Sequence, residues 1–129
     1  MLSGKITDEI FNSILPTYQL ERAYEWYSSY GSPDEQVQIL IYLGRSYFAD
    51  GDYDKAMSIY TNALDIAEKN KLNNLTGYIY DYIGDLYREK FMRTEAIKKY
   101  KAAAECFKKE KNTDSYACAL RDVGREYAE

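Results

Sequence analysis

Apolar residues recur every three or four positions along most of this chain, which is the spacing of one face of an α-helix. Leu40, Leu43 and Tyr47 follow this spacing in one segment, and Tyr60 and Ala63 follow it in the next. No segment of the sequence alternates apolar and polar residues convincingly, as a half-buried strand would. The pattern therefore predicts an all-α fold of about seven helices.

Residues that favour helix ends place the boundaries of the predicted helices. The sequence Ser-Pro-Asp-Glu at residues 32–35 combines a capping Ser, a Pro at the first helical position and a Glu three residues after the cap. Gly31 ends the helix before it, and Asp-Gly-Asp at residues 50–52 forms the turn after it. The predicted helices cover residues 7–15, 17–30, 33–49, 53–70, 75–90, 94–111 and, after the segment 112–114, a last helix that ends at 127.

A short motif, an apolar residue followed by Gly, two variable residues and Tyr, occurs at residues 43–47, 83–87 and 123–127, and so at a constant spacing. The three copies place Gly44, Gly84 and Gly124 inside predicted helices. Gly inside a helix costs about 1 kcal/mol relative to Ala, so its presence indicates the close approach of a neighbouring helix. We expect the small Ala56 and Ala63 of the next helix to meet the first of these glycines, with tyrosines filling the space beside the contact.

Residues 43–47 read Leu-Gly-Arg-Ser-Tyr, and residues 56–60 read Ala-Met-Ser-Ile-Tyr. This order, Leu-Gly-x-x-Tyr followed by Ala-x-x-x-aromatic, resembles the tetratricopeptide repeat (TPR). The resemblance implies a right-handed superhelix, that is, an α-solenoid of antiparallel TPR-like helix pairs. It also implies a protein- or peptide-binding scaffold within a larger regulatory or assembly protein.

Two features depart from the family pattern. The period is 40 residues rather than about 34, so the helices or connections are longer than usual. Phe91 stands where the second repeat should have its turn glycine, and we expect that turn to differ. Around residues 31–45 and 119–125 the sequence also resembles TPR-containing regulators and lipoproteins of Bacteroidetes.

We predict a single TPR-like domain over residues 1–129. Residues 7–31 form a degenerate first repeat or an N-terminal cap, residues 37–70 and 77–111 form two repeats, and residues 114–129 form the first helix of a further, incomplete repeat. The apolar seam of this last helix has no partner helix after it. We expect that the chain continues in the full protein or that another subunit covers the seam, which predicts self-association through the C-terminal helix.

The TPR resemblance implies that the first helix of each pair lines a concave surface. The residues expected on it are Gln38, Tyr42, Arg45, Phe48, Tyr78, Asp81, Tyr82, Asp85, Arg88, Arg121, Asp122 and Arg125. Tyr and Arg are favoured at binding hot spots, so we predict that this surface contacts the partner. The alternative is that some of these side chains pack against neighbouring first helices.

Asp81 and Asp85 lie one helical turn apart, which is also the spacing of an acid/base or metal-binding pair. We favour a solvated or salt-bridged face for them, because the sequence offers no third ligand or base. In the last helix, Arg121 and Arg125 bracket Asp122, an arrangement that suits an anion or an ion pair with nearby acids.

Positive charge is concentrated between residues 88 and 111, which contain nine Lys and Arg against four Asp and Glu in a chain of net charge −4. A basic belt of this kind suits nucleic acid, above all RNA, or an acidic partner, and this is the alternative function. We favour the solvated outer face of a second helix instead, because Glu95, Glu105 and Glu110 interrupt the belt.

The sequence supports neither catalysis nor a bound cofactor. It contains no histidine, and its two cysteines are too few for a disulfide framework or a four-thiolate zinc site. It contains no nucleophile–base pair or phosphate loop, so we predict that the protein is not an enzyme and binds no cofactor or metal. The longest apolar run, residues 39–43, is too short for a membrane span, and we expect a cytoplasmic or periplasmic location.

Overall fold

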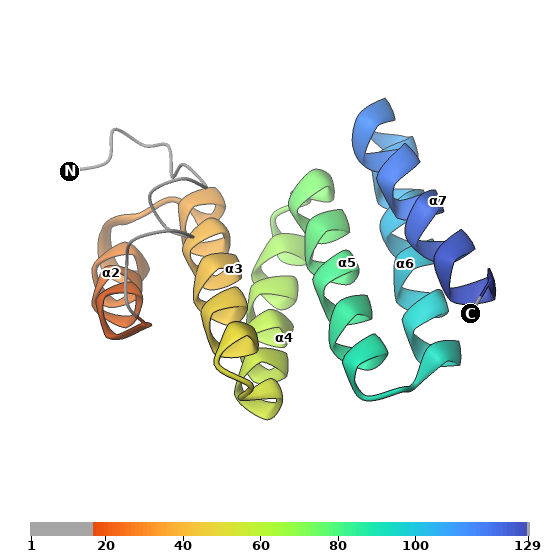
Figure 1. The fold of residues 1–129 in the computed structure, drawn as a ribbon. Coiled ribbons are helices and arrows are strands. Elements are labelled where there is room, and N and C mark those ends of the chain that lie inside the picture. The colour runs from red at the N-terminus through yellow and green to blue at the C-terminus, as the bar shows by residue number, and fades with distance from the viewer. Residues whose placement is uncertain (1–16, 129) are drawn as a thin grey trace. The chain divides into compact units, whose positions relative to one another are not determined.

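The structure, a computed structural model, describes residues 17–128, and every regular element in this part of the chain is an α-helix (Figure 1). The helices are α2 (Thr17–Tyr30), α3 (Pro33–Ala49), α4 (Tyr53–Lys69), α5 (Asn73–Glu89), α6 (Arg93–Lys109) and α7 (Thr113–Ala128). The all-α prediction is confirmed, and the helix predicted at residues 7–15 lies outside the described residues. None of the described helices is long and apolar enough to cross a membrane.

Helices α3 to α7 begin at a constant interval along the chain. They start at residues 33, 53, 73, 93 and 113, so each helix together with its connection has the same length. Each of α3 to α6 has 17 residues, and every connection between them is a short turn. The period of the sequence repeat therefore comes from pairs of equally long helices joined by short turns.

The connections after α3, α4, α5 and α6 end each helix with a left-handed residue. Their middle residues have φ values between 55° and 84° and are Gly51, Lys71, Phe91 and Lys111. The amide of Phe91 donates to the Arg88 carbonyl at 3.0 Å, and the amide of Met92 donates to the Tyr87 carbonyl at 2.8 Å, which is the Schellman pattern of helix ends. The prediction that the turn at Phe91 differs is wrong, because Phe adopts there the conformation that Gly has in the first repeat.

The helix starts are marked less uniformly than the helix ends. The Ser32 hydroxyl accepts a hydrogen bond from the Glu35 amide at 3.2 Å, and the Glu35 carboxylate accepts one from the Ser32 amide at 3.0 Å. Helices α5 and α6 begin after Leu72 and Met92, whose side chains make no capping hydrogen bond. The starts predicted at residues 75 and 94 are therefore late, because the preceding left-handed turn and not a capping side chain sets them.

The chain divides into two compact units, Met1–Asn70 and Lys71–Glu129. In the first unit α2 packs on α3 and α3 on α4, and in the second α5 packs on α6 and α6 on α7. Within each unit, helices joined by a short turn run antiparallel, as predicted (Figure 1). The superhelix and the single domain over residues 1–129 stay predictions.

Two of the three repeated glycines face an aromatic ring of the paired helix. A Cβ at Gly84 would lie 2.6 Å from Cε1 of Tyr100, and a Cβ at Gly44 would lie 2.7 Å from Cδ1 of Tyr60. The nearest atoms thus belong to tyrosine rings and not to the alanines predicted there. Gly124 is exposed, and a Cβ there would meet no atom within 4 Å, so the prediction of close approach is wrong for the third copy. Helix α4 covers Gly44 of α3, and helix α6 covers Gly84 of α5. Among residues 17–128, no helix covers Gly124 of α7 in the same way.

Candidate functional site

The predicted partner-contacting side chains of the first unit are held by contacts within that unit. Tyr42 is buried, and the guanidinium carbon of Arg45 lies 5.9 Å from the centre of the Tyr42 ring. Phe48 packs against Tyr53 of α4 with 5.3 Å between ring centres, and Gln38 donates a hydrogen bond within α3. Within the first unit these α3 residues thus contact different partners: the Tyr42 ring, Tyr53 and Asp34.

The second unit brings most of its predicted residues together. A polar cluster lies between α5 and α7. Its members are Asp81, Asp85 and Arg88 of α5, Tyr100 of α6, and Asp122, Arg125 and Glu126 of α7. Of the other predicted residues in this unit, Tyr78 and Arg121 are exposed and Tyr82 is half-buried. Arg88 of this cluster pairs with Glu126 of the neighbouring first helix, so for Arg88 the structure shows the alternative that the sequence left open.

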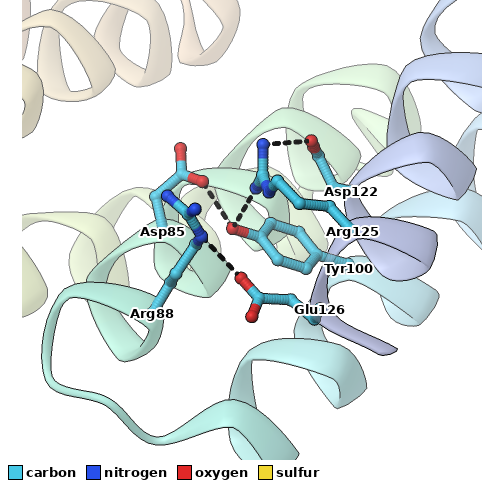
Figure 2. Close-up of polar contacts among 6 residues, drawn as sticks. All are labelled: Asp85, Arg88, Tyr100, Asp122, Arg125 and Glu126. Atoms are coloured by element: carbon cyan, nitrogen blue, oxygen red, sulfur yellow. Dashed lines mark hydrogen bonds and ion pairs between the residues drawn. The ribbon is translucent and has the colours of Figure 1, made fainter. Parts of the chain in front are cut away.

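The hydroxyl of Tyr100 lies at the centre of the polar cluster, between a carboxylate and a guanidinium (Figure 2). Tyr100 Oη donates to Asp85 Oδ1 at 2.6 Å and accepts from Arg125 Nη2 at 3.4 Å. Arg125 Nη1 also lies 3.3 Å from Asp122 Oδ1 on the same helix. The ring reaches this place because Gly84 has no side chain, so the residue that allows close packing also positions the hydroxyl.

Glu126 is, with Tyr100, one of two members of the polar cluster that are not among the predicted surface residues. It is 2% exposed, and its Oε1 lies 2.7 Å from Nε of Arg88, which reaches it from α5 (Figure 2). One period earlier the same repeat position holds the fully buried Leu86. A carboxylate at a core position of a repeat needs a cation nearby, so this departure from the repeat was the signal that could have found the pair.

Further polar contacts join α5 and α7 toward their N-terminal ends. Tyr78 Oη lies 2.8 Å from Ser115 Oγ, and Asn112 Nδ2 donates to Asn74 Oδ1 at 3.1 Å. The ring of Tyr78 packs on Phe107 of α6 with 4.9 Å between centres. The exposed Tyr78 is therefore fixed at both its ring and its hydroxyl, which reduces the entropy that it would lose on contacting a partner.

The carboxylates of the polar cluster outnumber the cations close to them. Burial and the neighbouring Asp122 raise the pKa of Asp81 from 3.8 to about 8, and Asp85 adds to this while Arg125 opposes it. Burial also raises the pKa of Asp85, although the hydrogen bond from Tyr100 lowers it. One oxygen of Asp81, Oδ1, is buried without a hydrogen-bond partner. The surroundings of Asp81 thus favour a proton or another positive charge.

A hollow of about 480 Å³ lies beside the turn between α5 and α6. It is lined by Arg88, Glu89, Phe91, Arg93 and Glu126. The Phe91 side chain is 95% exposed at the edge of this turn. Aromatic and guanidinium groups are therefore accessible next to the ion pair of Arg88 and Glu126.

Metal-ligating residue types and the basic lysines are the other candidate groups in the described part of the chain. Within residues 17–128, no three His, Cys, Asp or Glu side chains are placed to hold a metal ion. In the basic belt, Lys98 lies 3.3 Å from a carboxylate oxygen of Glu95, and Lys101 donates to the hydroxyl of Tyr127 at 3.0 Å. These two lysines therefore contact side chains of their own chain.

Comparison with known proteins supports the repeat. Residues 37–70 match the family model of the tetratricopeptide repeat, and these are the residues assigned above to the first full repeat. A curated relative, the Photosystem I assembly protein Ycf3 of Rippkaea orientalis (strain PCC 8801 / RF-1), is 32% identical over 91 residues. The match covers 69% of this chain and 52% of the relative, so the chain spans about half the length of the protein that it matches.

Proposed function

We propose that this chain is a protein- or peptide-binding module, part of a larger regulatory or assembly protein, and that it contacts its partner through the face formed by α5 and α7. The TPR at residues 37–70 and the similarity to a protein named for assembly support this function. The accessible residues of the face include Tyr78, Tyr82 and Arg121, which are residue types enriched at binding hot spots. The proposal assigns the chain no catalytic role.

The observation that carries the proposal is the excess of carboxylates around Asp81. Asp122 Oδ1 lies 3.3 Å from Nη1 of Arg125, the charge of Arg125 lowers the pKa of both Asp81 and Asp85, and Asp81 Oδ1 has no hydrogen-bond partner. A Lys or Arg side chain from a partner would supply the missing positive charge and would favour the ionised form of Asp81. We therefore propose a partner segment that carries a basic side chain.

The test begins with a displayed library of random peptides, selected against the immobilised chain. We expect the selected sequences to be enriched in Lys or Arg. Because a cation binds the ionised carboxylate, the affinity of the best peptide should rise by up to about tenfold per pH unit between about pH 6 and pH 8. Calorimetric titration of wild type at both pH values measures this dependence.

Three variants assign the binding to this face. Asp81→Asn should remove the pH dependence of the affinity, and Tyr82→Ala should weaken binding at both pH values by roughly tenfold or more. Glu105→Gln, on the exposed outer face of α6, serves as the matched control and should bind as wild type does. A library that yields no binder, or a binder insensitive to both Asp81→Asn and Tyr82→Ala, would contradict the proposal.

The narrower likeness to Bacteroidetes regulators and lipoproteins stays a prediction. In the basic belt, Lys98 and Lys101 are engaged with Glu95 and Tyr127 of the same unit, which favours a solvated helix face over a nucleic-acid interface. A binding module of this kind needs the rigid positioning of side chains, which the polar cluster supplies through hydrogen bonds to Tyr100.

A further inference from the structure

Helix α7 has an exposed face of small and apolar residues. This open face consists of Ala117, Leu120, Gly124 and Tyr127, which follow one another at intervals of three or four positions and so lie on one side of the helix. Leu120 is 46% and Tyr127 is 63% exposed, and a Cβ added at Gly124 would meet nothing within 4 Å. The open face shares no residue with the polar cluster, and it contacts α6 through the hydrogen bond from Lys101 to the Tyr127 hydroxyl at 3.0 Å.

The same four positions are covered in the first repeat. The equivalent positions two periods earlier, in α3, are Val37, Leu40, Gly44 and Tyr47. The three side chains among them are 0%, 1% and 9% exposed, and Gly44 is buried as well. The open face of α7 is thus the third copy of a repeated helix surface. In the first copy, on α3, the same surface is buried.

The helix that covers this surface brings a tyrosine onto the glycine. Tyr60 of α4 lies against Gly44, and Tyr100 of α6 lies against Gly84, so each tyrosine follows its glycine at the same interval. Both tyrosines are at most 1% exposed. Gly124 has the same position in the motif and therefore leaves room for the same ring.

A second position distinguishes α4, which covers this surface in the first repeat, from α6, which covers it in the second. In the second repeat, Gly77 lies against Phe107, and a Cβ at Gly77 would be 2.7 Å from Cε1 of that ring. In the first repeat the equivalent residues are Val37 and Ala67, both fully buried, so the larger side chain stands on the first helix. Helix α7 has Ala117 at this position, and its Cβ excludes a ring placed as Phe107 is placed.

We propose that the open face of α7 binds an amphipathic helix of the α4 type, with Tyr at the position that meets Gly124 and a small residue seven positions later. The sequence of α4 provides this pattern as Ala56, Tyr60, Ala63 and Ala67, all of them fully or almost fully buried. This surface is separate from the α5–α7 face of the proposed function, so either can fail without the other.

The direct test titrates the isotope-labelled chain with synthetic peptides and follows the backbone amides by NMR. A peptide with the sequence of residues 53–69 should shift the amides of Ala117, Leu120, Gly124 and Tyr127. The same peptide with Tyr60→Ala should bind at least roughly tenfold more weakly, because it lacks the aromatic anchor. A peptide with the sequence of residues 93–109 should also bind more weakly, because its Phe107 meets the Cβ at position 117.

Variants of the chain locate the binding. Gly124→Leu fills the open space and should weaken binding of the 53–69 peptide by roughly tenfold or more. Cys118→Ser, an exposed position elsewhere on α7, is the matched control and should bind as wild type does. Because isolated helices of this length are only marginally formed, a second measurement joins a copy of residues 50–70 directly after Glu129. This extended chain should resist urea better than the original, and Gly124→Leu should remove the gain.

Three results would overturn the proposal. One is an absence of amide shifts on α7 together with an extended chain no more stable than the original. Another is binding that is indifferent to Gly124→Leu. The third is a dimer, detected by sedimentation and broken by Gly124→Leu, because the occupant would then be the α7 of a second copy and not a helix of the α4 type. That third outcome is the self-association predicted from the sequence.

Discussion

Gly84 and Gly124 occupy the same place in the repeat, and substitution by Ala should have opposite effects at the two positions. At Gly84 the new Cβ would lie 2.6, 2.8 and 3.0 Å from three atoms of the Tyr100 ring. Carbon atoms that are not bonded prefer separations of about 3.5–4.0 Å, so the ring has to retreat by about 1 Å. Tyr100 is 0% exposed and its hydroxyl is bonded to Asp85, so the ring has nowhere to move without losing contacts.

The free-energy change at each glycine follows from three contributions. Overpacking of a core costs about 1–3 kcal/mol, and a weakened hydrogen bond to Asp85 adds about 1 kcal/mol. Replacing Gly by Ala inside a helix raises the unfolding free energy by about 1 kcal/mol. The Gly84→Ala variant should therefore lose about 2 kcal/mol of unfolding free energy. Gly124→Ala meets no atom and should gain about 1 kcal/mol, because only the helix propensity changes.

Urea unfolding followed by far-ultraviolet circular dichroism measures both variants against wild type. The expected separation between them is about 3 kcal/mol, which exceeds the error of such an extrapolation for a small domain. Equal stability of Gly84→Ala and wild type would refute the packing of Tyr100 on α5. A destabilised Gly124→Ala would show that another group already covers the open face of α7.

Other substitutions test the remaining features. Because the folded protein keeps a proton on Asp81 between about pH 4 and pH 8 that the unfolded chain does not, its stability should fall as the pH rises through this window, and Asp81→Asn should flatten the curve of urea midpoint against pH. Phe91→Gly should raise the unfolding free energy by about 0.5–1 kcal/mol, because Gly adopts the left-handed conformation without strain. Glu105→Gly, at an exposed position inside α6, should instead lower it by about 1 kcal/mol. A lower thermal midpoint for Phe91→Gly would contradict this. Ser32→Ala should lose about 1 kcal/mol with its capping box, while Ser58→Ala in mid-helix should lose nothing, as calorimetry can check.

The helical fold was predictable because several independent signals in the sequence, the repeat motif and the helix caps among them, indicate it. The motif around Gly44 and Gly84 predicted close helix contacts, and the Ser32 cap placed the start of α3. The starts of α5 and α6 were missed because Leu72 and Met92 carry no capping group, so the turn geometry that sets them leaves no local trace in the sequence.

The candidate site was only partly predictable for a different reason. The pattern places Asp81, Asp85 and Asp122 on first helices, but which of them touch depends on how α5 and α7 lie beside α6. The role of the Tyr100 hydroxyl was missed because the sequence alone makes this residue a space-filling ring. Glu126 was missed because the repeat motif gives no special role to its position.

The constant interval between the helix starts restricts how this chain can change in length. A single insertion into α5 would rotate the rest of that helix by about 100° and turn Gly84 away from its ring. Insertion of one whole period, by contrast, would add one first helix and one second helix and keep each buried glycine against the ring of its paired helix. Growth and shortening by whole blocks, as duplication or deletion of a gene segment produces them, are therefore the length changes that this architecture tolerates.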